Sequence, residues 1–425
     1  MFVKRIQRLP KKVNKLLHCA SKTAHTSRVR IYLVGGIVRD LILGKSNLDL
    51  DIVVEGDAIS FAKCVSHTLG VTFRTHHAFG TATIYCKDFK VDLATARKES
   101  YSRWGALPSV TPATVREDLF RRDFTINAMA VSLNKDDYGS LIDFYEGYQD
   151  LRRGVIRVLH PNSFLDDPTR IFRSIKFETR FSFHIERRTL RLLKKALRLK
   201  ALSWVGEHRL RDELMGILRE KKPYKYIKRI NELVGFKFMH HAIHLRREDF
   251  YLLLRIANTI TMYKEKFKKH RKLQEPMVYL MALIHRLIPQ DVSHFSHRFG
   301  LRKGERILLV STVVYKDKIK KLKKRNSSKV ALFKLLKGVS FETIIFFYAY
   351  YKDKKIRHLL RYFLGHLSSL KLKTKAKDLR KFEVLPERKY SKVLTKLLYR
   401  KIEKNLLTKK EELAELKKIL KYQLI

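Results

Sequence analysis

Hydrophobic and polar positions follow two different periods along this chain of 425 residues. Between about residues 30 and 160, short β-branched runs alternate with segments of helical spacing, which is typical of a small α/β unit. The expected strands are 31–34, 50–54, 81–85 and 91–94, and the expected helices are 37–43 and 58–69, each followed by a glycine that would end it. Residues 97–116 hold Gly105, Pro108 and Pro112 without a sustained period, so we expect a loop there.

The rest of the chain is predicted to be helical, because from Asp167 onward apolar residues recur at intervals of three and four. The expected helices are 164–177, 186–199, 207–218, 250–261, 276–287, 306–316, 330–336, 341–351, 355–367 and a last one from residue 392. We expect a basic helical lead-in over 1–30, an α/β head over 31–160, a helical neck over 161–225 and a basic helical body and tail over 226–425. The acid-free lead-in is also typical of an organellar transit peptide, and that alternative stays open.

The chain carries 92 Lys and Arg residues against 41 Asp and Glu, a formal net charge of +51. A charge of this size predicts a polyanionic partner, nucleic acid before membrane, although a general lysine bias would produce a similar composition. The three cysteines lack metal-binding or disulfide spacing, and no run approaches the roughly 20 apolar residues of a membrane span. We therefore expect a cytoplasmic protein that binds nucleic acid and no membrane.

A glycine pair follows the first expected strand, in the sequence Val34-Gly35-Gly36-Ile37. Two glycines at a strand-to-helix turn let backbone N–H groups approach an anion, and Arg39 adds a cation about one helical turn further on. This arrangement predicts a phosphate-binding turn.

Two carboxylates stand two residues apart in the next expected strand, so Asp49 and Asp51 would project to the same face of the sheet. Paired carboxylates beside a phosphate-binding turn can hold Mg²⁺ against a triphosphate, and the ordered combination predicts metal-assisted nucleotidyl transfer. Asp92, in the strand expected over 91–94, is a candidate third carboxylate. Its alternative role is to satisfy local N–H groups at the end of that strand.

Four further motifs follow in order: HHAFGTAT (76–83), VDLATAR (91–97), RRDFTINAMA (121–130) and DDPTRIFR (166–173). With the glycine pair and the two aspartates, they resemble the class II tRNA nucleotidyltransferases, the CCA-adding enzymes, to which bacterial poly(A) polymerases are closely related. The resemblance covers about residues 30–220. It implies a polymerase-β-like α/β nucleotidyltransferase head with a small mixed sheet, followed by an all-helical neck, body and tail. It also implies an enzyme that uses CTP and ATP with Mg²⁺ to extend the 3′ end of tRNA.

The resemblance assigns roles to residues of the head. In the wider polymerase-β-like superfamily, an acid at the place of Asp92 helps to deprotonate the attacking hydroxyl. Arg122 would place a guanidinium on the triphosphate, where its planar fork suits phosphate better than lysine does. Asp123 and Asn127, expected on one face of a helix over 124–131, would bond the ribose hydroxyls or the 3′-terminal nucleotide. Asp123 could also cap that helix.

Asp167 and Arg170 are the residues predicted to select the base. An Asp carboxylate that accepts a hydrogen bond beside an Arg guanidinium that donates one matches the amino group and ring nitrogen on the Watson–Crick edges of C and A. The edges of U and G present the reverse pattern and do not match. In the resembled family, the matching positions replace a template strand. Because an acid before Pro168 also suits a helix start, a purely capping Asp167 is the alternative. Arg173 would contact base or phosphate, and Lys176 stands where the family usually has arginine, which puts a bidentate contact there in doubt.

Residues 207–214 resemble the last motif of the family, which braces the helix with the base-selecting pair, so we interpret Glu207 as structural. The lysine-rich run 315–325 is either a solvated helix face or a surface that holds an RNA stem by its phosphates. The motifs do not separate full CCA addition from poly(A) synthesis or from addition of only CC or only A. A non-catalytic RNA-binding protein on this scaffold would require loss of the acids, and a small-molecule nucleotidyltransferase would not need so basic a chain.

Overall fold

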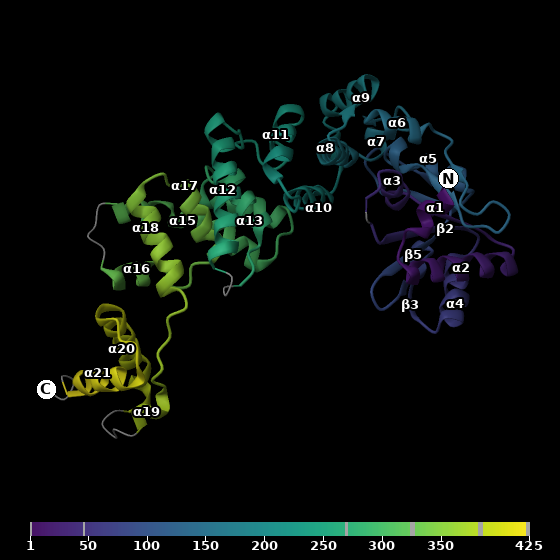
Figure 1. Cartoon of the computed structure of the whole chain (residues 1–425). Coiled ribbons are helices and arrows are strands. Elements are labelled where there is room, and N and C mark those ends of the chain that lie inside the picture. The colour runs from purple at the N-terminus through teal and green to yellow at the C-terminus, as the bar shows by residue number, and fades with distance from the viewer. Residues whose placement is uncertain (1, 46, 268–270, 324–327, 381–385, 422–425) are drawn as a thin grey trace. The chain divides into compact units, whose positions relative to one another are not determined.

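The computed structural model describes residues 2–45, 47–267, 271–323, 328–380 and 386–421 (Figure 1). The chain divides into two compact units, which are Met1–Leu214 with Glu232–Val234, and Met215–Asn231 with Gly235–Ile425. The first unit contains the sheet and the second is helical.

The first unit is built around a seven-stranded sheet with the order β3-β4-β5-β2-β1-β8-β9. Its strands are β1 (Arg30–Val34), β2 (Asp49–Glu55), β3 (Thr72–His76), β4 (Thr81–Tyr85), β5 (Lys90–Thr95), β8 (Ala130–Ser132) and β9 (Leu141–Ile142). β2 and β5 run parallel, while the other neighbouring strands are antiparallel. The mixed sheet expected for the head is therefore confirmed.

Helices cover both faces of this sheet. They are α1 (Phe2–Gln7), α2 (Lys11–Ser27), α3 (Gly36–Ile42), α4 (Ala58–Leu69), α5 (Val115–Phe120) and α6 (Gly147–Arg153). α2 packs against α4 and β1, and α4 also packs on β3, β4 and β5. Tyr32, Val34 and Val53 of the sheet form a buried cluster with Val115 and Leu119 of α5. The alternation of side chains along β1 thus places a core on each side of the strand.

The start and end of α4 illustrate how local sequence sets these elements. Asp57 caps the helix, because its carboxylate accepts a hydrogen bond from the Ile59 N–H at 2.9 Å. Gly70 ends it in the left-handed conformation at φ 62°, which a glycine adopts without steric cost. The helix predicted over 58–69 is therefore confirmed with its boundaries.

Two segments of the head differ from the prediction. The loop expected over 97–116 contains a two-stranded hairpin of β6 (Arg97–Ser100) and β7 (Ser109–Pro112). The helix expected over 124–131 is wrong, because the chain forms only a 3₁₀ turn, η2 (Thr125–Asn127), and then β8, which pairs with β1. Residues 124–134 are all buried. A segment that is buried on every side has no polar face, so the spacing of its apolar residues could not distinguish a helix from a strand.

The helices that follow the sheet in the first unit are α7 (Ser163–Asp166), α8 (Arg170–Phe181) and α9 (Arg187–Arg198), with a 3₁₀ turn η3 (Ala201–Trp204). The single helix expected over 164–177 is instead two helices separated at Pro168. Proline has no backbone N–H, and its ring clashes with the preceding turn, so it interrupts a helix. Two short strands, β10 (Val155–Ile156) and β11 (His184–Ile185), pair in parallel beside α8 and were not predicted. α10 (Glu207–Leu218) then runs from the first unit into the second.

The second unit is helical throughout its described residues, as expected. Its helices are α11 (Pro223–Leu233), α12 (Arg247–Lys266), α13 (Glu275–Ile284), α14 (Pro289–Arg298), α15 (Lys303–Lys320), α16 (Lys329–Leu336), α17 (Phe341–Tyr350), α18 (Lys354–Tyr362), α19 (Ala376–Arg380), α20 (Tyr390–Lys404) and α21 (Lys409–Lys421). Shorter turns are η4 (Lys321–Lys323), η5 (Phe363–Leu367), which is a π-helix, and η6 (Glu387–Lys389). The sequence did not predict α11, α14 and α19.

Two cores organise this unit. α13 is buried over Met277–Ile284 and packs against α12, α15 and α17. Near the C-terminus, apolar side chains of α19, α20 and α21 form a separate cluster. The fully buried Glu412 ties this cluster together, since its carboxylate accepts hydrogen bonds from the Lys373 and Thr374 N–H groups and from Lys401 Nζ.

Candidate active site

The predicted phosphate-binding turn lies between β1 and α3. Gly35 has φ 72°, and a Cβ added there would lie 2.7 Å from Arg122 Nη1 and 4.0 Å from Asp51 Oδ2. Glycine is therefore required both by the left-handed backbone and by the close approach of the Arg122 guanidinium. Gly36 is the first residue of α3 and has ordinary clearance.

Arg39 points from α3 into the same region but is already paired. It is 5% exposed, donates from Nε to Asp40 Oδ1 at 2.9 Å and from Nη1 to Asn127 Oδ1 at 2.6 Å. Its guanidinium also lies over the rings of Phe177 and Phe181. Burial lowers the pKa of Arg39, and the Asp40 carboxylate opposes that shift. Contact between Arg39 and a phosphate stays a prediction.

The paired carboxylates occupy the first residues of β2. Asp49 and Asp51 are two apart on the strand, and Asp51 is the register partner of Asp92 on the parallel strand β5. Burial, followed by the negative charges of Asp49 and Asp92, raises the pKa of Asp51 to about 6, although Arg122 acts in the opposite direction. These carboxylates therefore concentrate negative charge that the nearby guanidinium only partly offsets.

Asp92 itself is engaged by its neighbours on the sheet. Its Oδ1 accepts a hydrogen bond from Thr83 Oγ1 at 2.6 Å, and its Oδ2 accepts one from Lys90 Nζ at 2.5 Å. The acid thus satisfies local donors, as the alternative role described, while it also acts on Asp51 electrostatically.

A buried carboxylate that the sequence did not single out positions Arg122. Asp118 of α5 is 0% exposed and accepts hydrogen bonds from Arg122 Nη2 at 2.9 Å and from Arg121 Nη2 at 2.7 Å. Burial raises the pKa of Asp118, but the Arg122 and Arg121 guanidinium groups outweigh it and hold that pKa below its ordinary value. Within the described residues, Arg122 Nε is buried without a hydrogen-bond partner. The spacing of three and four residues between Asp118 and these arginines was a signal available in the sequence.

Asp123 and Asn127 come together as expected, although no α-helix carries them. Asp123 Oδ1 accepts from Asn127 Nδ2 at 2.9 Å and from the Phe124 N–H, and its Oδ2 accepts from Arg173 Nε at 2.8 Å. Despite burial, the Arg173 guanidinium and the Asn127 amide hold the pKa of Asp123 below its ordinary value. Arg173 therefore reaches this aspartate.

The predicted base-selecting pair flanks the break between α7 and α8. Asp167 Oδ1 accepts from the Thr169 N–H at 3.0 Å and from Arg209 Nη2 at 2.8 Å. Arg170, the first residue of α8, is 5% exposed and donates to Ser163 Oγ at 2.5 Å and to the Arg121 carbonyl at 2.7 Å. Asp167 thus accepts the local bond of a helix start and also lies at a cleft, so capping and base contact are compatible.

The last motif contacts this pair through a residue that the sequence analysis did not name. Arg209 of α10 bonds Asp167 and also donates from Nη1 to the Gly105 carbonyl at 3.4 Å, in the segment between β6 and β7. Gly105 has φ 73°, and a Cβ there would lie 2.8 Å from Trp204 Cβ, so the segment is held against η3. Within residues 207–214, Arg209 therefore makes a contact of the kind that the expected bracing role requires.

A cleft of about 690 Å³ in the first unit gathers these groups. The sequence-predicted residues that line it are Gly35, Gly36, Arg39, Asp49, Asp51, Arg122, Asp123, Asn127, Asp167, Arg170, Arg173 and Lys176. Asp92 does not line it. The lining residues that were not predicted are Asp40, Asn47, Glu99, Tyr101, Pro108, Arg121, Phe177, Arg180 and Arg209. Arginines, a lysine and carboxylates are interspersed over its lining, and together they suit a ligand that carries both phosphates and a metal ion.

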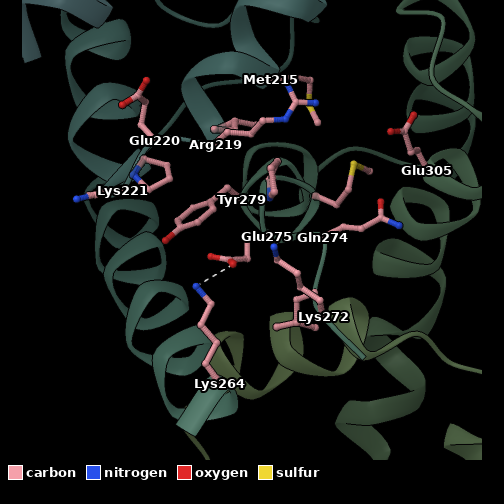
Figure 2. A pocket seen from close by; sticks show the side chains of 15 residues that line it. Met215, Arg219, Glu220, Lys221, Lys264, Lys272, Gln274, Glu275, Tyr279 and Glu305 are labelled. Atoms are coloured by element: carbon pink, nitrogen blue, oxygen red, sulfur yellow. Dashed lines mark ion pairs between the residues drawn. The ribbon is translucent and has the colours of Figure 1, made fainter. Parts of the chain in front are cut away.

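A second cavity, of about 620 Å³, lies in the helical unit (Figure 2). Lys264 Nζ and Glu275 Oε1 form an ion pair there at 2.8 Å, and further cations and carboxylates, including Arg219 and Glu305, are interspersed. None of the sequence-predicted site residues lines this cavity. The chemistry predicted from the motifs therefore belongs to the cleft of the first unit.

The lysine-rich run predicted over 315–325 begins on α15 and continues through η4, while Lys324 and Arg325 lie outside the described residues. Lys320, Lys321 and Lys323 are exposed, and Lys323 Nζ lies 3.3 Å from Asp353 Oδ2. Over the described ranges, no helix is long and apolar enough to span a bilayer. Over those ranges also, no three or more His, Cys, Asp and Glu side chains are grouped to hold a metal ion.

Comparisons with protein families, curated proteins and solved structures identify proteins similar to this chain. Residues 31–157 match the family model described as the poly A polymerase head domain. The chain is 33% identical over 412 residues to the A-adding tRNA nucleotidyltransferase of Geobacter sulfurreducens, over 95% of this chain and 47% of that protein. It spans about half the length of the curated relatives it matches.

Solved structures match over nearly the whole chain. One is a CCA-adding enzyme in apo form II, with a TM-score of 0.83, 35% identity and 97% of both chains covered. Another is the Thermotoga maritima CCA-adding enzyme complexed with tRNA-CCA, with a TM-score of 0.79, 34% identity, and 98% of this chain and 97% of that chain covered.

Proposed function

This chain belongs to the class II tRNA nucleotidyltransferase and bacterial poly(A) polymerase family, and we propose that it adds C and A to the 3′ end of tRNA from CTP and ATP without a template strand. One observation carries the proposal. The carboxylates Asp49 and Asp51, the guanidinium of Arg122 and the pair of Asp167 and Arg170 line a single cleft. Groups for a triphosphate and groups for a base are thereby within reach of one nucleotide.

The carboxylate pair fits a divalent cation, for which Mg²⁺ is the proposed ion. Burial raises the pKa of Asp51, and the negative charges of Asp49 and Asp92 raise it further. A cation held by Asp49 and Asp51 would offset those charges. Magnesium is commonly held by one or two carboxylates together with substrate phosphates, so two protein ligands are sufficient. When bound, the ion supplies charge stabilisation at the triphosphate and at the attacking oxygen.

The protein groups then position the reactants. Arg122, fixed by Asp118 and pressed against Gly35, is oriented to bind the triphosphate. The 3′ oxygen of the RNA forms a bond to the α-phosphorus while the bond to the β-phosphate oxygen breaks, and pyrophosphate leaves. Asp92 stays the predicted acceptor of the hydroxyl proton, and it would have to exchange its present bonds to Thr83 and Lys90 for that role.

Base selection is assigned to Asp167 and Arg170. The hydrogen bonds from Arg209 and Thr169 go to Asp167 Oδ1. The other oxygen, Oδ2, is the atom proposed to accept the exocyclic amino proton of C or A. The Arg170 guanidinium, with two of its N–H groups directed to Ser163 and Arg121, is proposed to donate to the adjacent ring nitrogen.

The test is incorporation into tRNA transcripts that end at the discriminator base, at C or at CC, each with one nucleotide supplied at a time and the products sequenced. Addition of C, C and then A, followed by arrest, is expected. Asp51→Asn serves as the inactive control. Extension by many A residues would instead identify a poly(A) polymerase, and no incorporation with any transcript would refute the proposal.

Addition of A alone is a second candidate, favoured by one observation. The Geobacter relative, which aligns with 95% of this chain, is named as an A-adding enzyme. The same assay separates the two activities, because an A-adding enzyme extends only the transcript that ends at CC.

A further inference from the structure

The most cationic helix of the first unit is α9 (Arg187–Arg198), which lies outside the cleft. Its sequence, RRTLRLLKKALR, contains six basic residues and no acid. The exposed side chains of α9 are all basic, namely Arg187, Arg188, Arg191, Lys194, Lys195 and Arg198. None of the six forms an ion pair in the part of the chain that the structure describes.

The helical repeat sorts these residues by face. Arg187, Arg191, Lys194 and Arg198 have spacings of four, three and four residues, so they form one stripe along the helix. The stripe extends about 16 Å, since eleven residues rise by about 1.5 Å each. The buried Thr189, Leu193 and Ala196 lie on the opposite side. The apolar face is thus used by the fold, and the cationic face is directed to solvent.

α9 is firmly held on the unit that carries the cleft. Glu186 caps the helix by accepting from the Arg188 and Thr189 N–H groups at 2.8 and 2.7 Å. Thr189 Oγ1 accepts from the Val158 N–H at 3.3 Å, and α9 packs on α7, the helix that ends immediately before Asp167. The stripe therefore keeps a fixed position relative to the predicted base-selecting residues.

The stripe weakens the helix when nothing binds it. Along the stripe, like-charged side chains are neighbours at spacings of three or four residues, and such pairs destabilise a helix. A helix needed only for packing would gain nothing from this arrangement. A rigid row of unneutralised cations is instead complementary to a row of phosphates.

We propose that the stripe of α9 binds the phosphate backbone of the RNA substrate, so that the first unit has its own RNA contact independent of the basic helical unit. This inference rests on the proposed function for the identity of the RNA. A membrane surface fits less well, because a helix that binds a bilayer inserts an apolar face, and the apolar residues of α9 are turned to the protein.

The test compares two doubly neutralised full-length proteins. Arg191→Gln/Lys194→Gln removes the centre of the stripe, and Lys15→Gln/Lys22→Gln removes two exposed lysines seven residues apart on α2, in the same unit. Affinity for tRNA is measured across a salt series, and the melting temperature of each protein is recorded. The α9 variant should bind roughly tenfold more weakly at 0.1 M salt, with the slope of log affinity against log salt reduced by about two, because two phosphate contacts are lost.

Its melting temperature should not fall, since like charges have been removed, and the α2 variant should bind as the wild type does. Equal affinities and slopes in all three proteins would overturn the proposal, and so would equal losses in both variants, which would indicate net charge alone. Loss of binding to anionic phospholipid vesicles with unchanged tRNA binding would assign the stripe to a membrane. The binding assay contains no nucleotides, so it does not depend on catalytic activity. A wild-type protein that binds tRNA but adds no nucleotide would refute the proposed function, while the comparison of tRNA affinities would still test the role of α9.

Discussion

Arg209→Gln tests whether the contact from α10 sets base selection. In the structure Arg209 Nη2 donates to Asp167 Oδ1 at 2.8 Å, and both side chains are 21% exposed. A hydrogen bond between charged groups is worth about 1.5–3 kcal/mol, and partial exposure favours the lower end of that range. Asp167 would still accept from the Thr169 N–H and hydroxyl, so the carboxylate would keep its place but lose the bond that fixes its rotation.

The expected result is therefore a loss of selection with little loss of stability. About 1.5 kcal/mol corresponds to roughly a tenfold fall in kcat/KM for CTP and ATP, because 1.36 kcal/mol is a factor of ten in rate. Use of UTP or GTP relative to CTP and ATP should rise, because a mobile Asp167 rejects the wrong base edge less strictly. The melting temperature should fall by only a few degrees, as expected for the loss of about 1.5 kcal/mol from a unit of this size.

The assay measures single-nucleotide incorporation with each of the four nucleotides on a transcript ending at CC or at the discriminator base. Arg211→Gln is the matched control, since Arg211 lies on the same helix and pairs with Asp212, whose side chain is 65% exposed. If Arg209→Gln kept the wild-type ratio of correct to incorrect nucleotide incorporation, the hydrogen bond from Arg209 to Asp167 would not be needed for base selection, and the prediction would be wrong.

Three other substitutions probe the carboxylate pair and the residues that position Arg122. Asp51→Asn should reduce incorporation to below about a tenth of the wild-type rate, because several kcal/mol of charge stabilisation are lost, while tRNA binding in a filter assay stays nearly intact. Gly35→Ala should displace Arg122 and cost about 1–2 kcal/mol of unfolding free energy through its positive φ, so incorporation should fall more than denaturant stability does; equal incorporation would contradict the close contact. Asp118→Asn should make the free energy of unfolding depend less steeply on pH in the acid range. Arg122 and Arg121 lower the pKa of Asp118 in the folded protein, so the stabilisation from its carboxylate is present above about pH 4 and is lost as the pH falls further. An unchanged stability profile between pH 2 and 5 (roughly the range in which aspartate titrates) would show that the pairing contributes nothing.

The sequence predicted the cleft better than it predicted the elements that build it. Gly35, Asp49, Asp51 and Asp167 lie at the ends of strands or helices, where β-branched runs, glycines and proline give strong local signals. Twelve of thirteen predicted site residues line the cleft, all but Asp92. Motifs at the ends of strands predict which residues lie close together, because the ends of adjacent strands lie at the same edge of the sheet.

The elements that were missed depend on partners distant in sequence. β8 has only three residues, and it forms because it pairs with β1, almost a hundred positions earlier in the chain. The spacing of hydrophobic residues within β8 itself does not indicate that pairing. β7 is exposed throughout, while β6 alternates between exposed and partly buried residues. One of the partly buried residues, Glu99, forms an ion pair with Arg121 at 3.0 Å. Long-range ion pairs and edge pairing of this type override propensity, so the segment was interpreted as a loop.

One dipeptide connects the two halves of the cleft. The carbonyl of Arg121 accepts a hydrogen bond from Nη2 of Arg170, the residue proposed to contact the base, at 2.7 Å. The next residue, Arg122, which is proposed to bind the triphosphate, lies against Gly35 and acts electrostatically on Asp51. Because Asp118 bonds both guanidinium groups, a shift of either arginine would change the other. Two consecutive residues therefore join the proposed base-selecting group to the proposed phosphate-binding group, and they would set the separation of the two groups in the proposed template-free enzyme.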